Sequence, residues 1–525
     1  MTDRRITPSQ LALFSRSPVI GAWWEELKAQ KLFSEELPAT SKLDELLYKQ
    51  GHKHEEVLLE QLEAEGKDVF RQQPVDPKGS LQEEDYANTL AAMQQGRQYI
   101  HQAALKNEEI RGWADLLERI EKPSALGDWS YIPIECKLSS HSKPIYLVQA
   151  CAYCELLEPL LGHRPEHFKL YLGGRRFELG EEGYPVTRFW SWYEQLRQRY
   201  RDFRAGFDAS QPPEDAPGDH GLWEPFIQQR LEEKRDLILV AGLRQSQRQK
   251  LRTAGITTID ALAGLPAERR VDGVEDSVLA RLREQARIQM ASEQRSDGRP
   301  AFEVRPTEQQ ASGLALLPAP DAGDIWFDME GFPDPISGDK LEYLFGACYR
   351  DTAGALQFHG WWAHTPAEEK QAFHDFVEWV EMRRETHPNL HVYHYASYEK
   401  TALGSLASRH QIHQALIDQW LRDELLVDLL PVVRNGLLVG APSYSIKKVE
   451  RLYGDARSEQ VDNAADSVVQ YAEWRKSKDS KILDDLYAYN EKDCEVTEGL
   501  HRFLLELPQR APNQFRANKW GRTTA

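Results

Sequence analysis

The sequence predicts an α/β fold that is divided among several domains. Its 525 residues are enough for about three domains of ordinary size. Segments with the apolar spacing of helices alternate with short strand-like segments, and this alternation is typical of α/β layers. Two stretches rich in Pro, Gly and polar residues, 211–219 and 296–324, are predicted to be linkers. They leave three blocks, at about 1–210, 220–295 and 322–508.

The composition indicates a folded, acidic protein. Hydrophobic residues make up 41% and charged residues 28% of the chain, and the net charge is −18, so a contact with nucleic acid would need locally concentrated positive charge or bound cations. There is no signal-like or membrane-spanning apolar run and no Gly-x-x-x-x-Gly-Lys-Ser/Thr loop, so we expect a cytoplasmic protein with no membrane partner and no nucleotide cofactor. The few, scattered cysteines argue against a disulfide framework and for a reducing compartment; they are Cys136, Cys151, Cys154, Cys348 and Cys494.

The first block contains the pattern on which the main functional prediction depends. Gly112-Trp-Ala-Asp115 precedes the strand-like segment Tyr131–Lys137. Because successive side chains on a strand point to opposite faces, Glu135 and Lys137 share one face and Cys136 lies on the other. Two carboxylates suit Mg²⁺ or Mn²⁺, and a neighbouring lysine can orient a metal-bound water that attacks phosphorus. The other elements expected here are helices over Leu43–Gly66 and Lys143–Leu161 and a strand over Phe168–Leu172.

Each piece of this pattern is common by itself, whereas the order of the pieces is informative. An isolated Glu-x-Lys is more often part of a surface strand, and a helical histidine is more often a core or surface residue than a ligand. Here Gly51-x-x-His54 comes first, the Gly-x-x-Asp and Glu-x-Lys motifs follow, and Gln149-x-x-x-Tyr153 ends the series on one helix face. This order, which follows an expected opening helix at Ile6–Phe14, resembles the RecB-like branch of the PD-(D/E)XK nucleases over about 200 residues.

The resemblance implies a restriction-endonuclease-like domain with one metal centre. By this resemblance the metal ligands are His54, Asp115 and Glu135, the catalytic residues are Asp115, Glu135 and Lys137, and the residues that support the site or contact DNA are Gln149 and Tyr153. Some members carry an iron–sulfur cluster whose first cysteine precedes a proline near the N-terminus. This chain has Ser17-Pro18 there, so no cluster is expected, and Cys151 and Cys154 are predicted to be helix-packing residues.

The middle block is short and helical, with two glycine turns. Val240–Leu243 contains Gly242, and Lys250–Ala263 contains Gly255. This segment resembles a pair of helix-hairpin-helix units, which implies contacts between backbone N–H groups at Gly242 and Gly255 and the phosphates of DNA. Residues 232–295 hold 12 Lys and Arg against 10 Asp and Glu, a local net charge of +2. The alternative is a helical spacer that packs against the flanking domains.

The last block has paired acidic residues near both of its ends. The expected strand Asp324–Glu330 puts Asp328 and Glu330 on one face, and Tyr489 and Asp493 lie one helical turn apart. This pattern resembles the DEDD exonucleases of the ribonuclease H-like fold, and among them the YprB-like domain. The other elements expected here are strands at Leu344–Cys348 and Leu390–His394 and a helix over Ala367–Arg384.

The second resemblance implies a second metal centre. It implies that Asp328, Glu330 and Asp493 bind metal ions and that Tyr489 positions or activates a water. Relatives have Asn-x-x-Phe-Asp where this chain has Tyr395-Ala-Ser-Tyr-Glu399, so Glu399 would replace an aspartate as a ligand. Asp428 is another acidic candidate.

A basic segment, Ser445–Tyr453, is expected to form a helix near the second centre. Its Lys447 and Lys448 could face DNA, although a solvated helix face is an equally good interpretation.

Together the three blocks resemble a bacterial group of RecB-family nucleases, and they predict a nuclease that uses Mg²⁺ or Mn²⁺. Its expected partner is DNA, as single strands, ends or branched intermediates in repair, recombination or defence, and its main site is Asp115, Glu135 and Lys137. One alternative is a binding scaffold for a separate helicase, without catalysis. The other is an RNA-processing exonuclease that uses only the last block.

Overall fold

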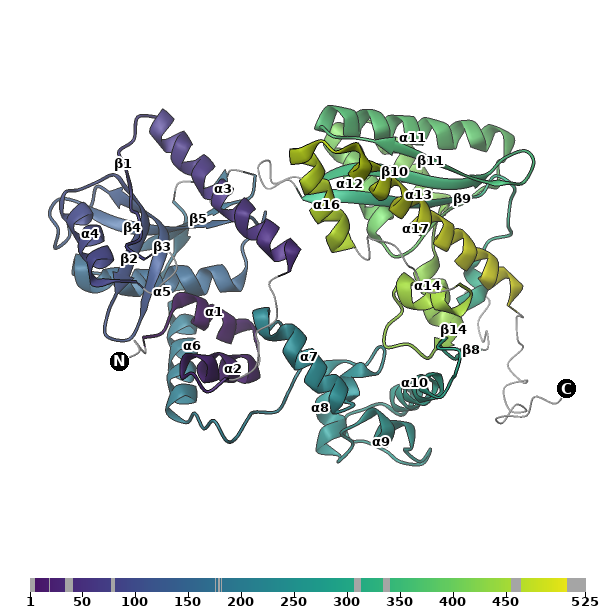
Figure 1. The fold of residues 1–525 in the computed structure, drawn as a ribbon, viewed down its shortest axis with the longest axis horizontal. Helices are drawn as coiled ribbons and strands as arrows, with labels where there is room; N and C mark the ends of the chain where they lie inside the picture. The colour runs from purple at the N-terminus through teal and green to yellow at the C-terminus, as the bar shows by residue number, and fades with distance from the viewer. Residues whose placement is uncertain are drawn as a thin grey trace. The chain divides into compact units, whose positions relative to one another are not determined.

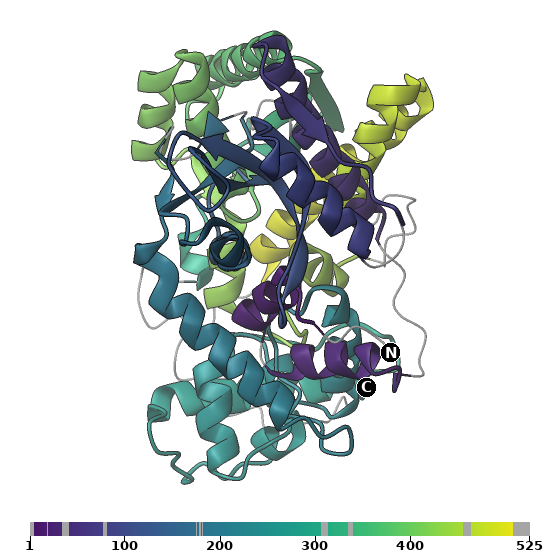
Figure 2. The same ribbon diagram turned by 90° about the vertical axis from the view of Figure 1, so that its left-hand side faces the viewer.

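The structure is a computed structural model, shown in Figure 1 and, turned by 90°, in Figure 2. It describes residues 5–17, 19–33, 41–76, 81–174, 176–177, 180, 182–305, 313–333, 340–454 and 464–507. The chain separates into two compact units, one ending at Arg230 and the other running from Leu231 to Phe332 and onward from Lys340. Among the described helices, none combines the length and the apolar character needed to cross a membrane.

The first unit is a mixed sheet with helices on both faces. Its strand order is β1-β2-β3-β4-β5-β6, and β7 pairs with β5. The strands are β1 (Val69–Arg71), β2 (Tyr99–Lys106), β3 (Arg111–Ile120), β4 (Ser130–Lys137), β5 (His167–Leu172), β6 (Arg176–Phe177) and β7 (Tyr184–Pro185). The helices are α1 (Pro8–Arg16), α2 (Val19–Ala29), α3 (Lys42–Ala64), α4 (Glu83–Gln94), α5 (Pro144–Leu161) and α6 (Thr187–Ala205), followed by the 3₁₀ turn η1 (Gly221–Trp223) and by α7 (Glu224–Glu233).

The strands β2, β3 and β4 form an antiparallel meander, after which α5 crosses over to β5, parallel to β4. Helix α3 packs through Leu58 and Leu62 against the sheet face that carries Ile134 and Cys136. The opposite face is covered by α5. The elements predicted for this block are therefore confirmed as α3, β4, α5 and β5, and the predicted opening helix as α1.

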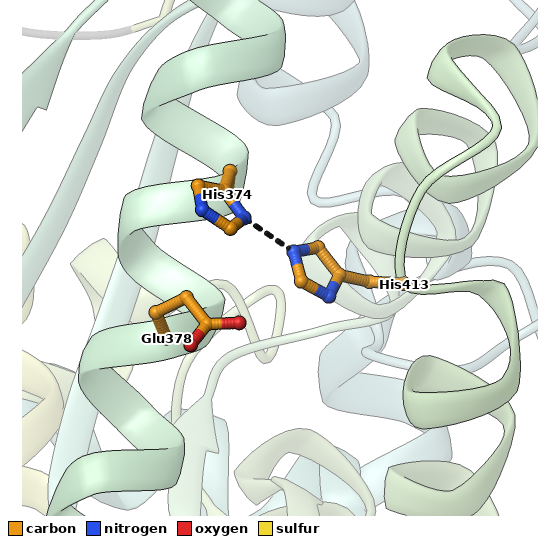
Figure 3. Close-up of side chains that lie close together, drawn as sticks. All are labelled: His374, Glu378 and His413. Atoms are coloured by element: carbon orange, nitrogen blue, oxygen red, sulfur yellow. Dashed lines mark hydrogen bonds between the residues drawn. The ribbon is translucent and has the colours of Figure 1, made fainter.

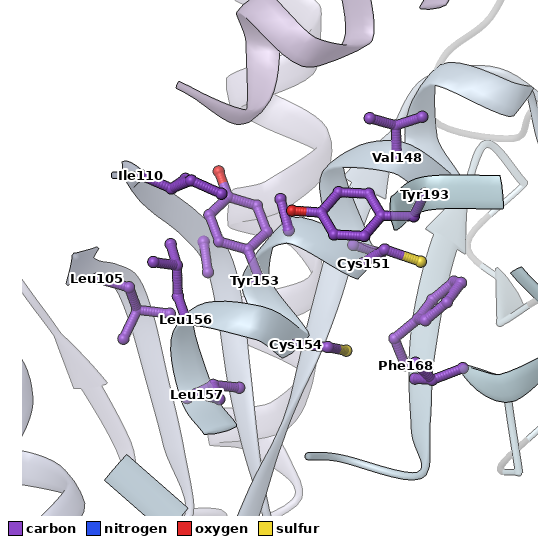
Figure 4. Packing of buried hydrophobic residues seen from close by; sticks show 14 of the residues in the cluster. Leu105, Ile110, Val148, Cys151, Tyr153, Cys154, Leu156, Leu157, Phe168 and Tyr193 are labelled. Atoms are coloured by element: carbon purple, nitrogen blue, oxygen red, sulfur yellow. The ribbon is translucent and has the colours of Figure 1, made fainter. Parts of the chain in front are cut away.

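Helix α5 carries the core of this unit, which Figure 4 shows from close by. Cys151 and Cys154 are both fully buried, and they pack among Leu157, Phe168 and Tyr193. Burial raises the pKa of the Cys151 thiol to about 12, so the side chain behaves as a small apolar group. The two cysteines thus have the packing role that the sequence predicts.

The second unit begins with a helical segment and continues into a five-stranded sheet of order β11-β10-β9-β12-β13. The helical segment contains η2 (Leu237–Leu239), α8 (Gln245–Thr253), α9 (Ile259–Ala263) and α10 (Asp276–Glu293). The strands are β8 (Phe302–Val304), β9 (Ile325–Pro333), β10 (Lys340–Arg350), β11 (Leu356–Trp362), β12 (Val392–His394), β13 (Leu426–Asp428) and β14 (Leu437–Val439). The other helical elements are η3 (Gly313–Leu316), α11 (Pro366–Thr386), α12 (Tyr398–His410), α13 (Gln414–Arg422), α14 (Leu429–Gly436), α15 (Ile446–Val449), η4 (Glu450–Leu452), α16 (Ala464–Ser477) and α17 (Ser480–Glu506).

The side chains of the central strand β9 alternate between two helices. Phe327 points to α11, where its ring stacks on Phe376 at a centroid distance of 4.2 Å. The alternate residue Asp328 points to α17, where it meets Asn490. The close approach of α17 depends on Gly346 of β10, because a Cβ there would lie 1.7 Å from Asn490 Oδ1. The strands and the helix predicted for this block are confirmed as β9, β10, β12 and α11.

The helical segment from Leu231 is joined to the rest of the second unit through α10. Gln285 Nε2 donates to the Val439 carbonyl at 2.8 Å, and the Tyr444 hydroxyl donates to Gln285 Oε1 at 3.1 Å. Gly242 and Gly255 both adopt positive φ, 79° and 83°, which favours glycine at these turns. Their phosphate contacts and the three-block division remain predictions.

Candidate active sites

The first candidate site lies where the pairing of β3 and β4 ends. The β3–β4 ladder stops at the Leu116–Ile134 pair. Beyond that pair, Asp115 Oδ2 accepts a hydrogen bond from the Cys136 backbone N–H at 2.8 Å. On the other side, Gln102 of β2 has a positive φ of 51°, which costs about 1–2 kcal/mol for a residue with a Cβ. The sheet is therefore irregular where the Asp115 carboxylate lies.

Lys137 joins the two predicted carboxylates of this site. Its Nζ lies 2.7 Å from Glu135 Oε2 and 3.3 Å from Asp115 Oδ2. Burial alone would lower the pKa of Lys137, but Asp115 and Glu135 outweigh it and hold this pKa well above its usual value. Burial, with the charge of Asp115, raises the pKa of Glu135 to about 8. The structure thus brings Asp115, Glu135 and Lys137 together.

His54 occupies a different environment from these three residues. It is buried on α3, its ring stacks on Tyr171 at 4.7 Å, and its Nε2 lies 3.4 Å from the Tyr171 carbonyl oxygen. Among the described residues, His54, Asp115 and Glu135 do not form a set of ligand atoms that all lie within 4.8 Å of one another. The neighbouring Glu55, which the motif analysis passed over, contributes to the raised pKa of Glu135. No sequence pattern singles out Glu55.

The two residues predicted on α5 differ in their surroundings. Tyr153 is buried, and its hydroxyl donates to the Trp113 carbonyl at 2.5 Å, so it fixes the strand that carries Asp115. Gln149 Nε2 donates to Ser9 Oγ at 3.5 Å across to α1. Position 112 next to Tyr153 requires a glycine, because a Cβ there would lie 2.8 Å from Pro8 Cδ. In this structure Tyr153 is a supporting residue of the site.

Ser17 occupies the position where some RecB-like nucleases have the first cysteine of an iron–sulfur cluster, and here it makes a local structural contact. The Ser17 hydroxyl lies 2.6 Å from His220 Nδ1 in a buried contact, and Pro18 lies outside the described residues.

The second candidate site is a cluster of three carboxylates in the second unit. Asp328 and Glu330 come from β9 and Asp493 from α17, and one oxygen of each lies within 4.8 Å of the other two. The spacing of residues along each element explains part of this arrangement. Asp328 and Glu330 are two residues apart and share a strand face, and Asp493 lies one helical turn from Tyr489. The packing of α17 on β9 and β10 then brings the strand pair and the helix residue together. Three carboxylate oxygens at this spacing are a ligand set for hard divalent cations.

The electrostatics of this cluster reflect mutual repulsion. Burial, with the charge of Asp493, raises the pKa of Glu330 to about 8. Burial and the charges of Asp493, Glu330 and Glu399 raise the pKa of Asp328 well above its usual value. The donors that hold the two strand carboxylates are neutral: Asn490 Nδ2 to Asp328 at 2.7 Å, and the Ser467 hydroxyl to Glu330 at 2.8 Å.

Glu399, the residue predicted to replace an aspartate ligand, lies close to the cluster but outside it. It is the second residue of α12, and its Oε2 lies 3.4 Å from His394 Nδ1. That His394 nitrogen donates to the Ala396 carbonyl at 2.7 Å. The ligand atoms within 4.8 Å of one another are those of Asp328, Glu330 and Asp493 and do not include Glu399. The other candidate, Asp428, caps α14 through the Leu430 N–H.

The basic segment after Ser445 differs from the single helix that we expected. The α-helix α15 covers only Ile446–Val449 and continues as the 3₁₀ turn η4; buried Val449 and Leu452 are three residues apart, the period of a 3₁₀ turn. Lys448 is exposed. Lys447 instead buries its Nζ 5.7 Å from the centre of the Tyr489 ring. Of the two lysines, Lys447 therefore lies beside a predicted catalytic residue.

Neighbours of the second cluster that the motif analysis missed are Asn490, Ser467, Tyr343 and Lys340. The position of Asn490 beside Tyr489 is the one signal that the sequence offers for them. The others come from β10 and α16 and meet the strand β9 only in the folded chain.

Comparison with known proteins identifies part of the second unit. A family model described as the RNase_H superfamily matches residues 325–505. No curated protein and no solved structure gives a significant match to the chain. Residues 325–505 therefore form an RNase H-like domain, as the sequence predicts, and such domains act on nucleic acid with the help of divalent metal ions.

Proposed function

We propose that the chain is a divalent-metal-dependent nuclease that hydrolyses DNA, with its main catalytic centre at Asp328, Glu330 and Asp493. The observation that carries the proposal is the carboxylate cluster, whose three oxygens lie within 4.8 Å of one another inside an RNase H-like domain. The sequence motifs favour the Asp115 site as the main centre, whereas the ligand geometry favours the site of Asp328, Glu330 and Asp493. Within the RNase H-like class, the Asp-x-Glu strand and the Tyr-x-x-x-Asp helix support a DEDD-type, YprB-like exonuclease.

The residues of this centre fit a divalent cation. The oxygen donor set suits Mg²⁺ or Mn²⁺. Glu399 Oε2 is buried beside the centre and accepts no hydrogen bond among the described residues, although His394 Nδ1 lies 3.4 Å away, and the charge of Glu399 adds to that of the cluster. A cation held by Asp328, Glu330 and Asp493 would supply positive charge to a phosphodiester and would lower the pKa of a water.

The side chains around the cluster supply the remaining functions. Tyr489 is on the same helix as Asp493 and is buried to 4% exposure, so its hydroxyl can orient a water from inside the site. Lys447 lies beside the Tyr489 ring, and its Nζ donates no hydrogen bond among the described residues. An unpaired amine at this place is suited to a phosphate oxygen of the substrate. Asn490 holds Asp328 in position.

A second catalytic centre at Asp115, Glu135 and Lys137 is proposed on a separate observation. Glu135 Oε1 is buried without a hydrogen-bond partner among the described residues, while Lys137 contacts both carboxylates. A carboxylate pair with a lysine suits metal-assisted hydrolysis of a phosphodiester. This arrangement supports the RecB-like, PD-(D/E)XK assignment. His54 packs on Tyr171, so it is not part of the proposed ligand set.

The test is a cleavage assay with labelled single-stranded DNA, duplex DNA and RNA, in Mg²⁺, Mn²⁺ or EDTA. Five proteins are compared: wild type, Asp328→Asn, Lys137→Ala, the double variant, and Glu385→Gln, an exposed substitution on α11, as the control. We expect divalent-dependent cleavage of DNA that Asp328→Asn strongly reduces, that the double variant loses and that Glu385→Gln leaves unchanged.

Other outcomes of this assay separate the alternatives. Salt-sensitive DNA binding without cleavage would support a scaffold for a helicase. Preferential cleavage of RNA that survives Lys137→Ala would support the RNA-processing exonuclease. Full activity in the double variant would overturn both proposed centres.

A further inference from the structure

The second unit contains a cluster of two histidines and one glutamate, His374, Glu378 and His413 (Figure 3). It lies at α11, the helix that covers the Phe327 side of the sheet. His374 and Glu378 are four residues apart on α11 and are therefore neighbours on one helix face. His413 reaches them from the turn between α12 and α13. Ligand atoms of the three residues all lie within 4.8 Å of one another. The carboxylate cluster belongs to the other face of the sheet, so the two sets are separate.

The two histidines meet through their ring nitrogens. His374 Nδ1 and His413 Nε2 are 2.8 Å apart, and the rings are nearly parallel, with a centroid distance of 5.0 Å. One ring must donate and the other accept, so at least one of them is neutral, which is the form that binds a metal. His413 precedes α13 with a φ of 54° but makes no capping hydrogen bond to that helix. Its side chain is directed to His374.

Glu378 is the third member of the set. It is exposed, and it forms no hydrogen bond or ion pair with any described residue. In Figure 3 its side chain extends from α11 on the same side as His374, toward the ring of His413. Neither histidine has an ion pair with another carboxylate in the described part of the chain. Apart from the hydrogen bond between the two histidines, the three converging side chains have no hydrogen-bond or ion-pair partner among the described residues.

We propose that His374, Glu378 and His413 form a binding site for Zn²⁺. Two imidazole nitrogens and one carboxylate oxygen are a ligand set that Zn²⁺ accepts, with water as a fourth ligand on the exposed side. The same set is poor for Mg²⁺, which prefers oxygen donors. The two clusters of this unit thus differ in the cation they select. Zn²⁺ here links α11 to the α12–α13 turn and stabilises the domain by binding only its folded form.

The experiment is a titration of the full chain with Zn²⁺ in excess Mg²⁺, followed by calorimetry, with Co²⁺ as a spectroscopic probe. Excess Mg²⁺ occupies the oxygen-only centres. The wild-type protein is expected to bind one Zn²⁺ and to give the visible absorption of low-coordinate Co²⁺ with nitrogen ligands. His413→Ala is expected to weaken Zn²⁺ binding by about 100-fold or more, above the loss known for residues that only support a ligand. His359→Gln, at an exposed histidine on β11, is the matched control and should bind as the wild type does.

A second variant distinguishes the loss of a metal ligand from a folding defect. Glu378→Gln changes an exposed side chain, so the metal-free melting temperature should not change, whereas Zn²⁺ affinity should fall by about 10-fold. In the wild-type protein Zn²⁺ should raise the melting temperature, and in His413→Ala it should not. Absence of Zn²⁺ binding in the wild type, or an unchanged affinity in both His413→Ala and Glu378→Gln, would overturn the proposal. Neither result depends on nuclease activity.

Discussion

The two carboxylate centres of this protein handle buried negative charge in opposite ways. In the first unit, Lys137 contacts both Asp115 and Glu135 and provides an internal counter-charge. In the second, Asp328, Glu330 and Asp493 face one another, and the donors to the two strand carboxylates are an amide and a hydroxyl. The first centre is therefore stabilised before any cation arrives, whereas the second accumulates repulsion that a divalent cation would relieve. Loss of a charge should consequently destabilise the first unit and stabilise the second.

The largest expected effect is on catalysis at the second centre. In a Lys137→Ala background, Asp328→Asn should reduce DNA cleavage by at least about 1,000-fold, because a lost ligand removes several kcal/mol of transition-state stabilisation. Initial rates in Mg²⁺ measure this loss. The protein should melt no lower than its parent, which separates a chemical defect from unfolding. Cleavage within a factor of about two of the parent would place catalysis elsewhere.

Substitution of Tyr489 should have a smaller effect on the same centre. Tyr489→Phe removes the hydroxyl that orients water and should lower kcat by about 100-fold with little change in KM. Tyr487→Phe is the matched control, because Tyr487 lies on the same helix and packs its ring on Phe358. Equal kcat values for the two variants would argue against a role of Tyr489 in the chemical step.

The first unit should lose stability when the positive charge of Lys137 is removed. Lys137→Met leaves Asp115 and Glu135 without their shared partner, and it should lower the free energy of unfolding of the first unit by about 2 kcal/mol. Lys122→Met is the control, since Lys122 pairs with Glu166 at 2.7 Å on the surface, with side-chain exposures of 39% and 69%, and such pairs contribute less than about 1 kcal/mol. Chemical denaturation of both variants measures the difference. Equal losses would mean that Lys137 is not an internal counter-charge.

The second centre should respond to pH in the opposite sense from a salt-bridged carboxylate. The pKa of Glu330 is raised from 4.5 to about 8 in the folded, metal-free protein, so the folded state binds its proton more tightly than the unfolded state does. This contribution to stability is complete below pH 4.5 and is lost as the pH rises to about 8. Glu330→Gln removes this penalty and should therefore stabilise the protein by about 3 kcal/mol more at pH 8 than at pH 5. Melting curves in EDTA at both pH values test it, and a parallel shift at both would contradict it.

The parts of this picture that the sequence predicts are those with local periodicity. Asp328 and Glu330 are two residues apart on a strand, and Tyr489 and Asp493 are one turn apart on a helix, so backbone geometry alone puts each pair on one face. The same reasoning identified Glu135 and Lys137. The RNase H-like fold of the last block was predicted from the resemblance of these two patterns to those of DEDD exonucleases.

The parts that the sequence did not predict depend on contacts between distant segments. Asn490 holds Asp328 across 162 positions, and this contact needs a glycine at position 346. His54 had a plausible spacing as a ligand, yet its ring packs on Tyr171, because α3 covers the Cys136 face of the sheet. The Lys447 amine lies beside Tyr489, and a charge pattern along one short segment cannot reveal such burial. Spacing identifies which residues share a face, and packing decides what that face meets.

The hydrogen bond from the Cys136 backbone N–H to Asp115 has a consequence for how the first centre can be observed. This amide has a carboxylate as its acceptor, in a sheet where neighbouring amides use strand carbonyls. A cation that draws the Asp115 carboxylate toward itself competes with the N–H for the same oxygen. The exchange rate of this one amide with deuterated water would therefore report on cation binding at the proposed first centre, without substrate and without mutation. An exchange rate that did not change on addition of Mg²⁺ or Mn²⁺ would argue against a cation at Asp115.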